Sequence, residues 1–275
     1  MHNVAWCTDL HFDSTSVSRI DSFIREVEST NASSILITGD ISNAKRITVD
    51  LEYLETKLQR PIYFVLGNHD FYGSYIESTR NEVTALCRRS TYLKYLTSVS
   101  LIIIGSTAII GHDGWYDARA GSYKETTFLM NDWVQIGDFA TKSVVDHLRM
   151  VANYRRVAEI AMPLADASCV HLTASIKDAV RAKCTNIIIA THVPPFISSH
   201  IHRGVVGDVN AHPWYVNHAL GMTLRAAKAT YRNVNFWVFA GHTHSEYVGV
   251  IDGVNVRVGS AEYTMPRVAD VITIK

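Results

Sequence analysis

The chain has 275 residues, of which 47% are hydrophobic and 19% charged, and its 26 Lys and Arg residues balance its 26 Asp and Glu residues. This length fits one large domain, or one domain with an insertion, and the composition excludes an intrinsically disordered chain. The zero net charge argues against a protein that coats nucleic acid or a membrane surface, and no apolar run approaches the roughly 20 residues that span a bilayer.

The cysteines and the first residues indicate the cellular compartment. No Cys-x-x-Cys pair occurs among Cys7, Cys87, Cys169 and Cys184, so we expect reduced, buried thiols rather than disulfide bonds. The chain also enters an apolar strand, Asn3 to Cys7, almost directly, without the basic region and long apolar stretch of a secretory signal. We therefore expect a soluble, cytoplasmic protein, with no membrane partner.

Short apolar runs rich in Ile and Val, mostly bounded by turn residues, predict buried strands along the whole chain. In chain order they are Val4–Cys7, Ser34–Ile37, Ile62–Leu66, Leu101–Ile104, Thr107–Ile110, Asn186–Ala190, Phe236–Phe239, Tyr247–Ile251, Val254–Val258 and Val271–Ile274.

Stretches with helical spacing of apolar residues lie between these runs, and the alternation of strand and helix predicts an α/β fold. The predicted helices are Ser16–Ser29, Val49–Leu58, Tyr75–Arg89 and Leu172–Cys184. Near the end, Asp252-Gly253 joins two strands as a hairpin, so the sheet should be mixed rather than purely parallel.

The middle of the chain, about 115–166, interrupts this alternation. It is rich in aromatic residues up to Phe139 and then has a helical pattern over Thr141–Ala161. We interpret it as an insertion or cap on a single domain that spans 1–275. Its aromatic residues could stack on a substrate, but packing within the insertion is the favoured interpretation.

Polar residues of ligand type follow directly after five of the predicted strands. The clusters are Asp9-Leu10-His11, Gly39-Asp40, Gly67-Asn68-His69-Asp70, Thr191-His192 and Gly241-His242-Thr243-His244. In open α/β sheets, ligands bind beyond the carboxyl ends of the strands, so these groups should meet at one edge. Taken singly, each could be an ordinary turn or capping residue, but five such strand ends by accident are improbable.

The chemistry of these side chains predicts metal binding. Carboxylates combined with neutral imidazoles suit Zn, Mn, Fe, Co or Ni better than Ca or Mg, which prefer oxygen ligands alone. The set is too large for one tetrahedral ion and fits two ions that share a carboxylate. A glycine before Asp40, Asn68 and His242 lets the backbone turn sharply and come close to an ion without a Cβ clash.

These blocks, in this order over positions 9–244, resemble the pattern of the calcineurin-like metallophosphoesterases. That pattern is Asp-x-His, Gly-Asp, Gly-Asn-His-Asp/Glu, a lone His and Gly-His-x-His. Gly-Asn-His-Asp and Gly-His-x-His, each after an apolar strand, are its most specific parts. The resemblance implies a four-layer α/β/β/α sandwich with two mixed β-sheets, and it implies a hydrolase that cleaves phosphate esters.

The resemblance also implies a role for each matching residue. Asp9, His11 and His244 are expected to bind a first metal ion, Asn68, His192 and His242 a second, and Asp40 both. His69 resembles the catalytic histidine, expected here to act as a general acid, and Asp70 the acid that orients it. Two such ions would activate a bridging water for attack on phosphorus.

Three further residues are candidates for substrate contacts. His112 follows the strand Thr107–Ile110, while His202 and Arg203 lie in the loop that leaves His192, where loops often reach the substrate. Arg203 could bind a phosphate or another acidic group. A solvated surface loop remains the plainer interpretation of that segment.

The substrate, the mono- or diester preference, the native metals and the oligomeric state do not follow from these patterns. We expect a small-molecule phosphate ester or a nucleotide. A nuclease of the same family is the first alternative, disfavoured because the chain lacks Lys/Arg runs that would neutralise a nucleic-acid backbone. A catalytically silent metal-binding scaffold is the second, disfavoured because no motif residue is missing.

Overall fold

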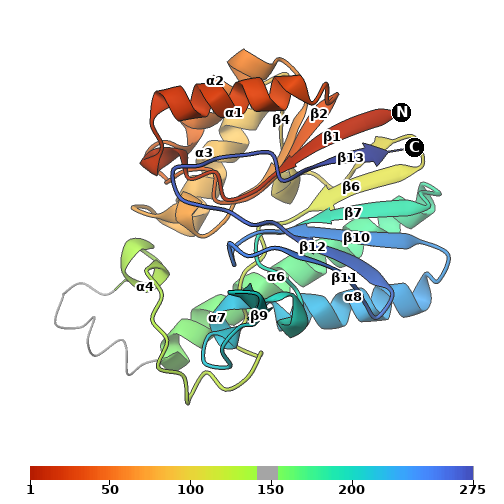
Figure 1. Cartoon of the computed structure of the whole chain (residues 1–275). Coiled ribbons are helices and arrows are strands. Elements are labelled where there is room, and N and C mark those ends of the chain that lie inside the picture. Colours follow the sequence, from red (N-terminus) through yellow and green to blue (C-terminus); the bar gives the residue numbers. More distant parts are fainter. Residues whose placement is uncertain (141–153, 275) are drawn as a thin grey trace.

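The computed structural model describes residues 1–140 and 154–274, and two mixed β-sheets lie at its centre (Figure 1). In the first sheet, four strands run parallel, and the last strand of the chain pairs antiparallel with the first. Its order is β13 (Asp270–Ile274), β1 (His2–Cys7), β2 (Ser34–Thr38), β3 (Ile62–Val65) and β4 (Leu93–Tyr95).

The second sheet has a parallel centre and an antiparallel strand at each edge. Its order is β11 (Tyr247–Ile251), β12 (Val254–Val258), β10 (Asn235–Ala240), β7 (Asn186–Ala190), β6 (Thr107–Gly111) and β5 (Ile102–Ile104). A short hairpin, β8 (Ile201–His202) with β9 (Val205–Val206), stands apart from both sheets.

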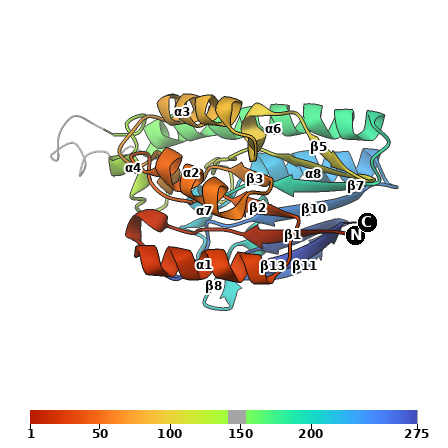
Figure 2. The same ribbon diagram turned by 90° about the horizontal axis from the view of Figure 1, so that it is seen from above.

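Helices cover the outer face of each sheet, which gives four layers (Figures 1 and 2). The first sheet is covered by α1 (Val17–Ser29), α2 (Ile47–Leu58) and α3 (Ile76–Arg89), and the second by α6 (Tyr154–Arg181) and α8 (His218–Thr230). Each helix buries one apolar stripe, as in α1, where Ile20, Phe23, Ile24 and Val27 are buried. The expected sandwich with two mixed sheets is therefore confirmed.

The two sheets pack face to face through side chains that alternate along the strands. Trp6 and Val65 from the first sheet meet Ile109, Ile188 and Phe239 from the second, with the Trp6 and Phe239 ring centroids 4.9 Å apart. Because these strands are buried on both faces, they read in the sequence as nearly continuous apolar runs. This packing brings the carboxyl ends of the parallel strands of both sheets to one side of the molecule.

All the predicted strands are present, but several elements lie outside the sequence expectations. Strand β4, the hairpin β8–β9 and helix α8 were not expected, nor were the short helices α4 (Asp132–Gln135) and α7 (His212–Tyr215). Helix α8 reads Ala-Leu-Gly-Met-Thr-Leu, a weaker apolar pattern with a glycine inside it. Among the described residues, no helix is long and apolar enough to cross a membrane.

The aromatic segment that begins at Trp115 packs into the protein core. Trp115, Tyr116, Trp133 and Phe139 are buried in the cluster that also holds the first sheet and its helices, so packing is their role here. The expected helix over Thr141–Ala161 falls largely on 141–153, outside the described residues. Its remainder belongs to α6, which continues past position 166 and covers the second sheet.

Two isoleucines on the paired strands β5 and β6 test the importance of the inter-sheet core. Ile109 is fully buried between the sheets, whereas the side chain of Ile103 is 50% exposed. Ile109→Ala should lower the free energy of unfolding by about 2–5 kcal/mol, and Ile103→Ala by less than about 1 kcal/mol. Urea denaturation measures both values, and equal losses would contradict the assigned packing.

Candidate metal centre

The predicted ligand residues lie in the loops that leave five parallel strands. Asp9 and His11 follow β1, Asp40 follows β2, and Asn68 begins the turn after β3. From the second sheet, His192 follows β7, and His242 and His244 follow β10. All seven side chains except that of His244 are almost fully buried. The fold therefore gathers distant parts of the chain at one edge, as the motif spacing predicts.

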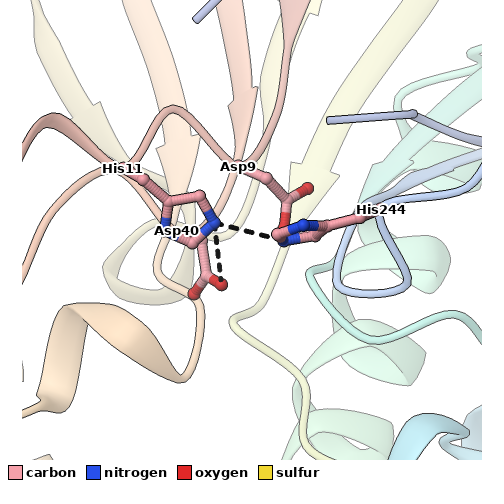
Figure 3. Close-up of side chains that lie close together, drawn as sticks. All are labelled: Asp9, His11, Asp40 and His244. Carbon is pink, nitrogen blue, oxygen red and sulfur yellow. Dashed lines mark hydrogen bonds and ion pairs between the residues drawn. The ribbon is translucent and has the colours of Figure 1, made fainter. Parts of the chain in front are cut away.

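A first group consists of Asp9, His11, Asp40 and His244, whose side chains point toward a common centre (Figure 3). One ligand atom from each lies within 4.8 Å of the others. His11 Nε2 and His244 Nε2 are 3.1 Å apart, and His244 Nε2 is 3.3 Å from Asp9 Oδ1. Nitrogen and oxygen atoms that share so small a space are typical of ligands around one cation.

A second group consists of Asn68, His192 and His242. His192 Nδ1 lies 2.9 Å from the Thr38 carbonyl oxygen, and His242 Nε2 lies 3.1 Å from the Trp214 carbonyl oxygen. Because a carbonyl oxygen only accepts hydrogen bonds, these two nitrogens carry the ring hydrogens. The opposite nitrogens, His192 Nε2 and His242 Nδ1, each lie 3.0 Å from Asn68 Oδ1, another acceptor. When both rings are neutral, three lone pairs thus converge, and a cation satisfies all of them.

Asp40 lies between the two groups. Its Oδ1 is 3.3 Å from His192 Nε2, and its Oδ2 is 3.9 Å from His11 Nε2. Burial alone would raise the pKa of Asp40, but His192 and His69 beside it hold that pKa well below its usual range. One carboxylate therefore presents an oxygen to each group and stays ionised, as a bridging ligand must.

The electrostatics of the centre agree with the need for a cation. Burial opposes a charge on His192, yet Asp40 next to it raises the pKa of His192 to about 10. Without a metal ion, a proton therefore also occupies His192 Nε2, the nitrogen that faces Asp40, and it partly balances the charge of the carboxylates. A metal ion must displace that proton. The donor set of carboxylates, imidazoles and one amide oxygen fits a pair of divalent transition-metal ions.

The backbone of the loops is unusual at the candidate ligands themselves. Asp9, His11, Asp40, His242 and His244 all have positive φ angles, between 44° and 71°. Such residues are uncommon outside glycine, although Asp and His tolerate the conformation better than most. Each costs on the order of 1–3 kcal/mol, a strain that proteins keep at functional sites.

Glycines permit the close approach of these loops. A Cβ added at Gly67 would lie 2.2 Å from Asp40 Oδ1, and one at Gly241 would lie 2.2 Å from Asp9 Oδ2. Gly39 itself has a φ of 90°, and a Cβ there would meet the His192 ring at 2.6 Å. A side chain at any of these three glycines would therefore collide with a candidate ligand, while their expected role of bringing the backbone close to an ion stays a prediction.

His69 stands beside this centre and reaches solvent. Its Nε2 is 4.0 Å from Asp40 Oδ2, and its side chain is 19% exposed. The ring stacks on Tyr72 at a centroid distance of 4.3 Å and meets the edge of His11 at 4.6 Å. The imidazole is thus held next to the ligands while one side remains open to an incoming molecule.

Asp70 does not occupy the position expected of it. Its Oδ1 accepts the Ser42 N–H at 2.7 Å and its Oδ2 accepts the Gly67 N–H at 2.8 Å. The side chain is fully buried and supports the loops after β2 and β3. The expectation that Asp70 orients the His69 ring is therefore corrected: among the described residues, its hydrogen bonds go to the backbone, because the turn at His69 directs the two side chains apart.

A cavity of about 890 Å³ opens over the metal centre. Two of the expected substrate residues, His202 and Arg203, line it from the hairpin β8–β9, and both are exposed. Phe128 and Met130 from the aromatic segment line another part. The cavity therefore combines the proposed ligands with an arginine and apolar side chains.

His112 is the expected substrate residue that the structure places elsewhere. It is buried, its Nδ1 accepts the Gly114 N–H at 3.1 Å, and its ring lies 5.3 Å from the ring of His171 on α6. It does not line the cavity, so its expected role is wrong. The turn after β6 carries His112 against helix α6 instead of toward the ligands.

The structure also brings residues to the centre that sequence reasoning missed. The Tyr263 ring lies 4.5 Å from that of His11, the Tyr215 ring lies 4.7 Å from that of His242, and both line the cavity. Asp132 Oδ1 accepts the Asn68 Nδ2 hydrogen at 2.8 Å. These residues lie in loops or short helices without a motif, so no sequence signal marks them.

The buried, neutral His112 makes stability depend on pH. Burial lowers the pKa of His112 to about 3, whereas an unfolded chain has a histidine pKa of about 6.5. As the pH falls from 6.5 toward 3, the unfolded state takes up a proton that the folded state refuses, so stability is lost. Replacing His112 with Asn should remove up to about 1.4 kcal/mol per pH unit of this loss. Urea titrations from pH 7 to 4 test this, and parallel curves for both proteins would contradict it.

Comparison with known structures agrees with the fold. The chain aligns in structure with a phosphopantetheinyl hydrolase from Mycobacterium tuberculosis at a TM-score of 0.61 and 13% identity, over 95% of this chain and 90% of the other. It aligns with a dimetal phosphatase from Danio rerio at a TM-score of 0.58 and 11% identity, over 94% and 87%. At these identities, the likeness shows a shared fold.

A search of the curated proteins finds no significant match. The model of the calcineurin-like phosphoesterase family, however, matches residues 2–246, which include every ligand candidate described above. The chain therefore belongs to the calcineurin-like phosphoesterase family.

Proposed function

We propose that this protein hydrolyses phosphomonoesters or phosphodiesters with two divalent transition-metal ions, such as Mn, Fe, Zn, Ni or Co. The single observation that carries the proposal is the convergence of imidazole nitrogens, carboxylate oxygens and one amide oxygen in two adjacent buried groups that share Asp40. Without cations, only bound protons, such as the one that the raised pKa of His192 indicates, relieve the repulsion among these buried atoms.

The assignment of ligands follows the two groups. Asp9, His11 and His244 would hold the first ion, Asn68, His192 and His242 would hold the second, and Asp40 would contribute to both. When bound, the pair of ions supplies a water of lowered pKa and a positive clamp for the phosphate oxygens. The chain orients the ligands through the carbonyl groups of Thr38 and Trp214, which fix the ring hydrogens of His192 and His242.

His69 is the proposed general acid. Its ring is adjacent to the centre but not part of either group, and it is exposed on the side of the cavity. A protonated Nε2 can donate its hydrogen to the oxygen of the leaving alcohol and stabilise the charge that develops there. The ring of Tyr72 stacks on the His69 ring and limits its rotation.

The proposed substrate is a small phosphate ester or a nucleotide, and the proposed location is the cytoplasm. His202 and Arg203 reach the cavity from the hairpin and can bind a second acidic group of the substrate. Among the described residues that line the cavity, Arg203 is the one arginine or lysine. A nucleic acid would need more such residues along its backbone, so the nuclease alternative is less favoured.

Activity and metal content together test the proposed centre. A generic mono- and diester substrate is assayed with Mn, Zn, Ni and Mg added in turn, and we expect turnover only with the transition metals. Asp40→Ala should lose both turnover and bound metal, because it removes a ligand of both ions. His69→Ala should lower kcat by roughly 10²–10⁴ while both ions remain bound.

Two outcomes would contradict the proposal. A wild-type protein that binds fewer than two ions and cleaves no ester would instead be the silent scaffold. A His69→Ala protein that loses its metals would show that His69 is a ligand and not the acid.

Arg203 should contribute to substrate binding alone. Arg203→Met keeps much of the apolar stem but removes the charge, so KM should rise roughly three- to tenfold with kcat and metal content nearly unchanged. Lys177→Met, on helix α6 outside this cavity, is the matched control and should leave KM unchanged. An unchanged KM in Arg203→Met would show that Arg203 is a solvated surface residue that does not bind the substrate.

A further inference from the structure

We infer that Asp132 is a positioning residue that fixes the side-chain amide of Asn68 with its oxygen toward the metal centre. The inference rests on the proposed function, because it concerns how one proposed ligand is oriented. Asp132 begins the short helix α4 and lies far from every motif of the sequence.

The orientation of an amide is a physical problem for a metal site. The oxygen and nitrogen ends of Asn68 have nearly the same size, so packing alone cannot distinguish one rotamer from the flipped one. Only the oxygen can bind a cation. In the flipped arrangement, the NH₂ group of Asn68 would face His192 and His242 and exclude a metal ion.

Asp132 resolves this ambiguity by chemistry. Its Oδ1 accepts the Asn68 Nδ2 hydrogen at 2.8 Å and the Tyr72 hydroxyl hydrogen at 2.7 Å. Asn68 Nδ2 also lies 3.3 Å from the Tyr72 hydroxyl oxygen. A flipped amide would place its oxygen against the Asp132 oxygen, two acceptors without a hydrogen between them. Asp132 therefore selects the rotamer in which Asn68 Oδ1 faces the two histidines.

The burial of Asp132 supports a role beyond local packing. The residue has no exposed surface, and its Oδ2 has no hydrogen-bond partner within the described part of the chain. A buried carboxylate with an unsatisfied oxygen is costly, and such groups are usually retained for a specific interaction. Tyr72, which Asp132 also binds, stacks on His69. One carboxylate from the aromatic segment thus supports a proposed ligand directly and the proposed acid through Tyr72.

Metal binding to the metal-free protein tests this inference without any assay of turnover. Calorimetry with Mn²⁺ should give two ions per chain for the wild type. In Asp132→Leu, which has no acceptor, the affinity of one ion should fall roughly 10- to 100-fold, the range typical for groups that orient metal ligands. The isosteric Asp132→Asn keeps an acceptor oxygen, so its loss should be smaller. Asn68→Ala is the reference that lacks the amide.

A double variant separates orientation from general damage. In an Asn68→Ala background, Asp132→Leu should weaken Mn²⁺ binding no further, because the amide that it orients is gone. Asp117→Leu is the matched control: Asp117 is another fully buried carboxylate of the same segment, which accepts the backbone N–H groups of Arg119 and Ala219. It should leave Mn²⁺ binding unchanged.

The possible failures are distinguishable. Wild-type affinity for both ions in Asp132→Leu, or an added loss in the double variant, would overturn the role of Asp132 and leave the metal centre standing. A wild-type protein that binds fewer than two Mn²⁺ ions would overturn the proposed function itself.

Discussion

The crowding of buried imidazole nitrogens, carboxylate oxygens and one amide oxygen around two points is the constraint on which this structure depends. Thr38 and Trp214 take the ring hydrogens of His192 and His242, so the free nitrogens turn toward Asn68 Oδ1. On the other side of Asp40, the nitrogens of His11 and His244 crowd together beside Asp9. Such an arrangement is stable only around positive charge. Protons meet this need in part, as the raised pKa of His192 indicates, and divalent cations meet it fully.

The fold exists to bring these atoms together from distant parts of the chain. Two sheets packed face to face deliver the ends of β1, β2 and β3 opposite those of β7 and β10. Positive φ angles then turn Asp9, Asp40 and His242 inward immediately after their strands. The backbone strain and the buried charges both oppose stability. The apolar core, which lies between the two sheets and between each sheet and its helices, offsets these unfavourable contributions. A small site of this kind therefore needs a domain of this size.

The sequence predicted the architecture and the candidate ligands that the fold brings together, but not the residues that support them. Strand runs such as Asn186–Ala190 were evident because burial on both faces leaves a continuous apolar pattern, and ligands stood out because turns with Gly39 or Gly241 precede them. Helix α8 was missed because its glycine weakens the pattern. Asp70 and His112 were misjudged because adjacency in sequence does not tell where a turn sends a side chain. Asp132 and Tyr263 act through tertiary contacts, which leave no periodic signal.

The most direct test of the central claim is a crystal structure of the protein grown with Mn²⁺, with anomalous scattering used to locate the ions. The account predicts two peaks: one among Asp9, His11, Asp40 and His244, the other among Asp40, Asn68, His192 and His242. The Asp40 carboxylate should lie between them, and their separation should be about 3.5–4 Å. A single peak, or two peaks that do not share Asp40, would contradict the account.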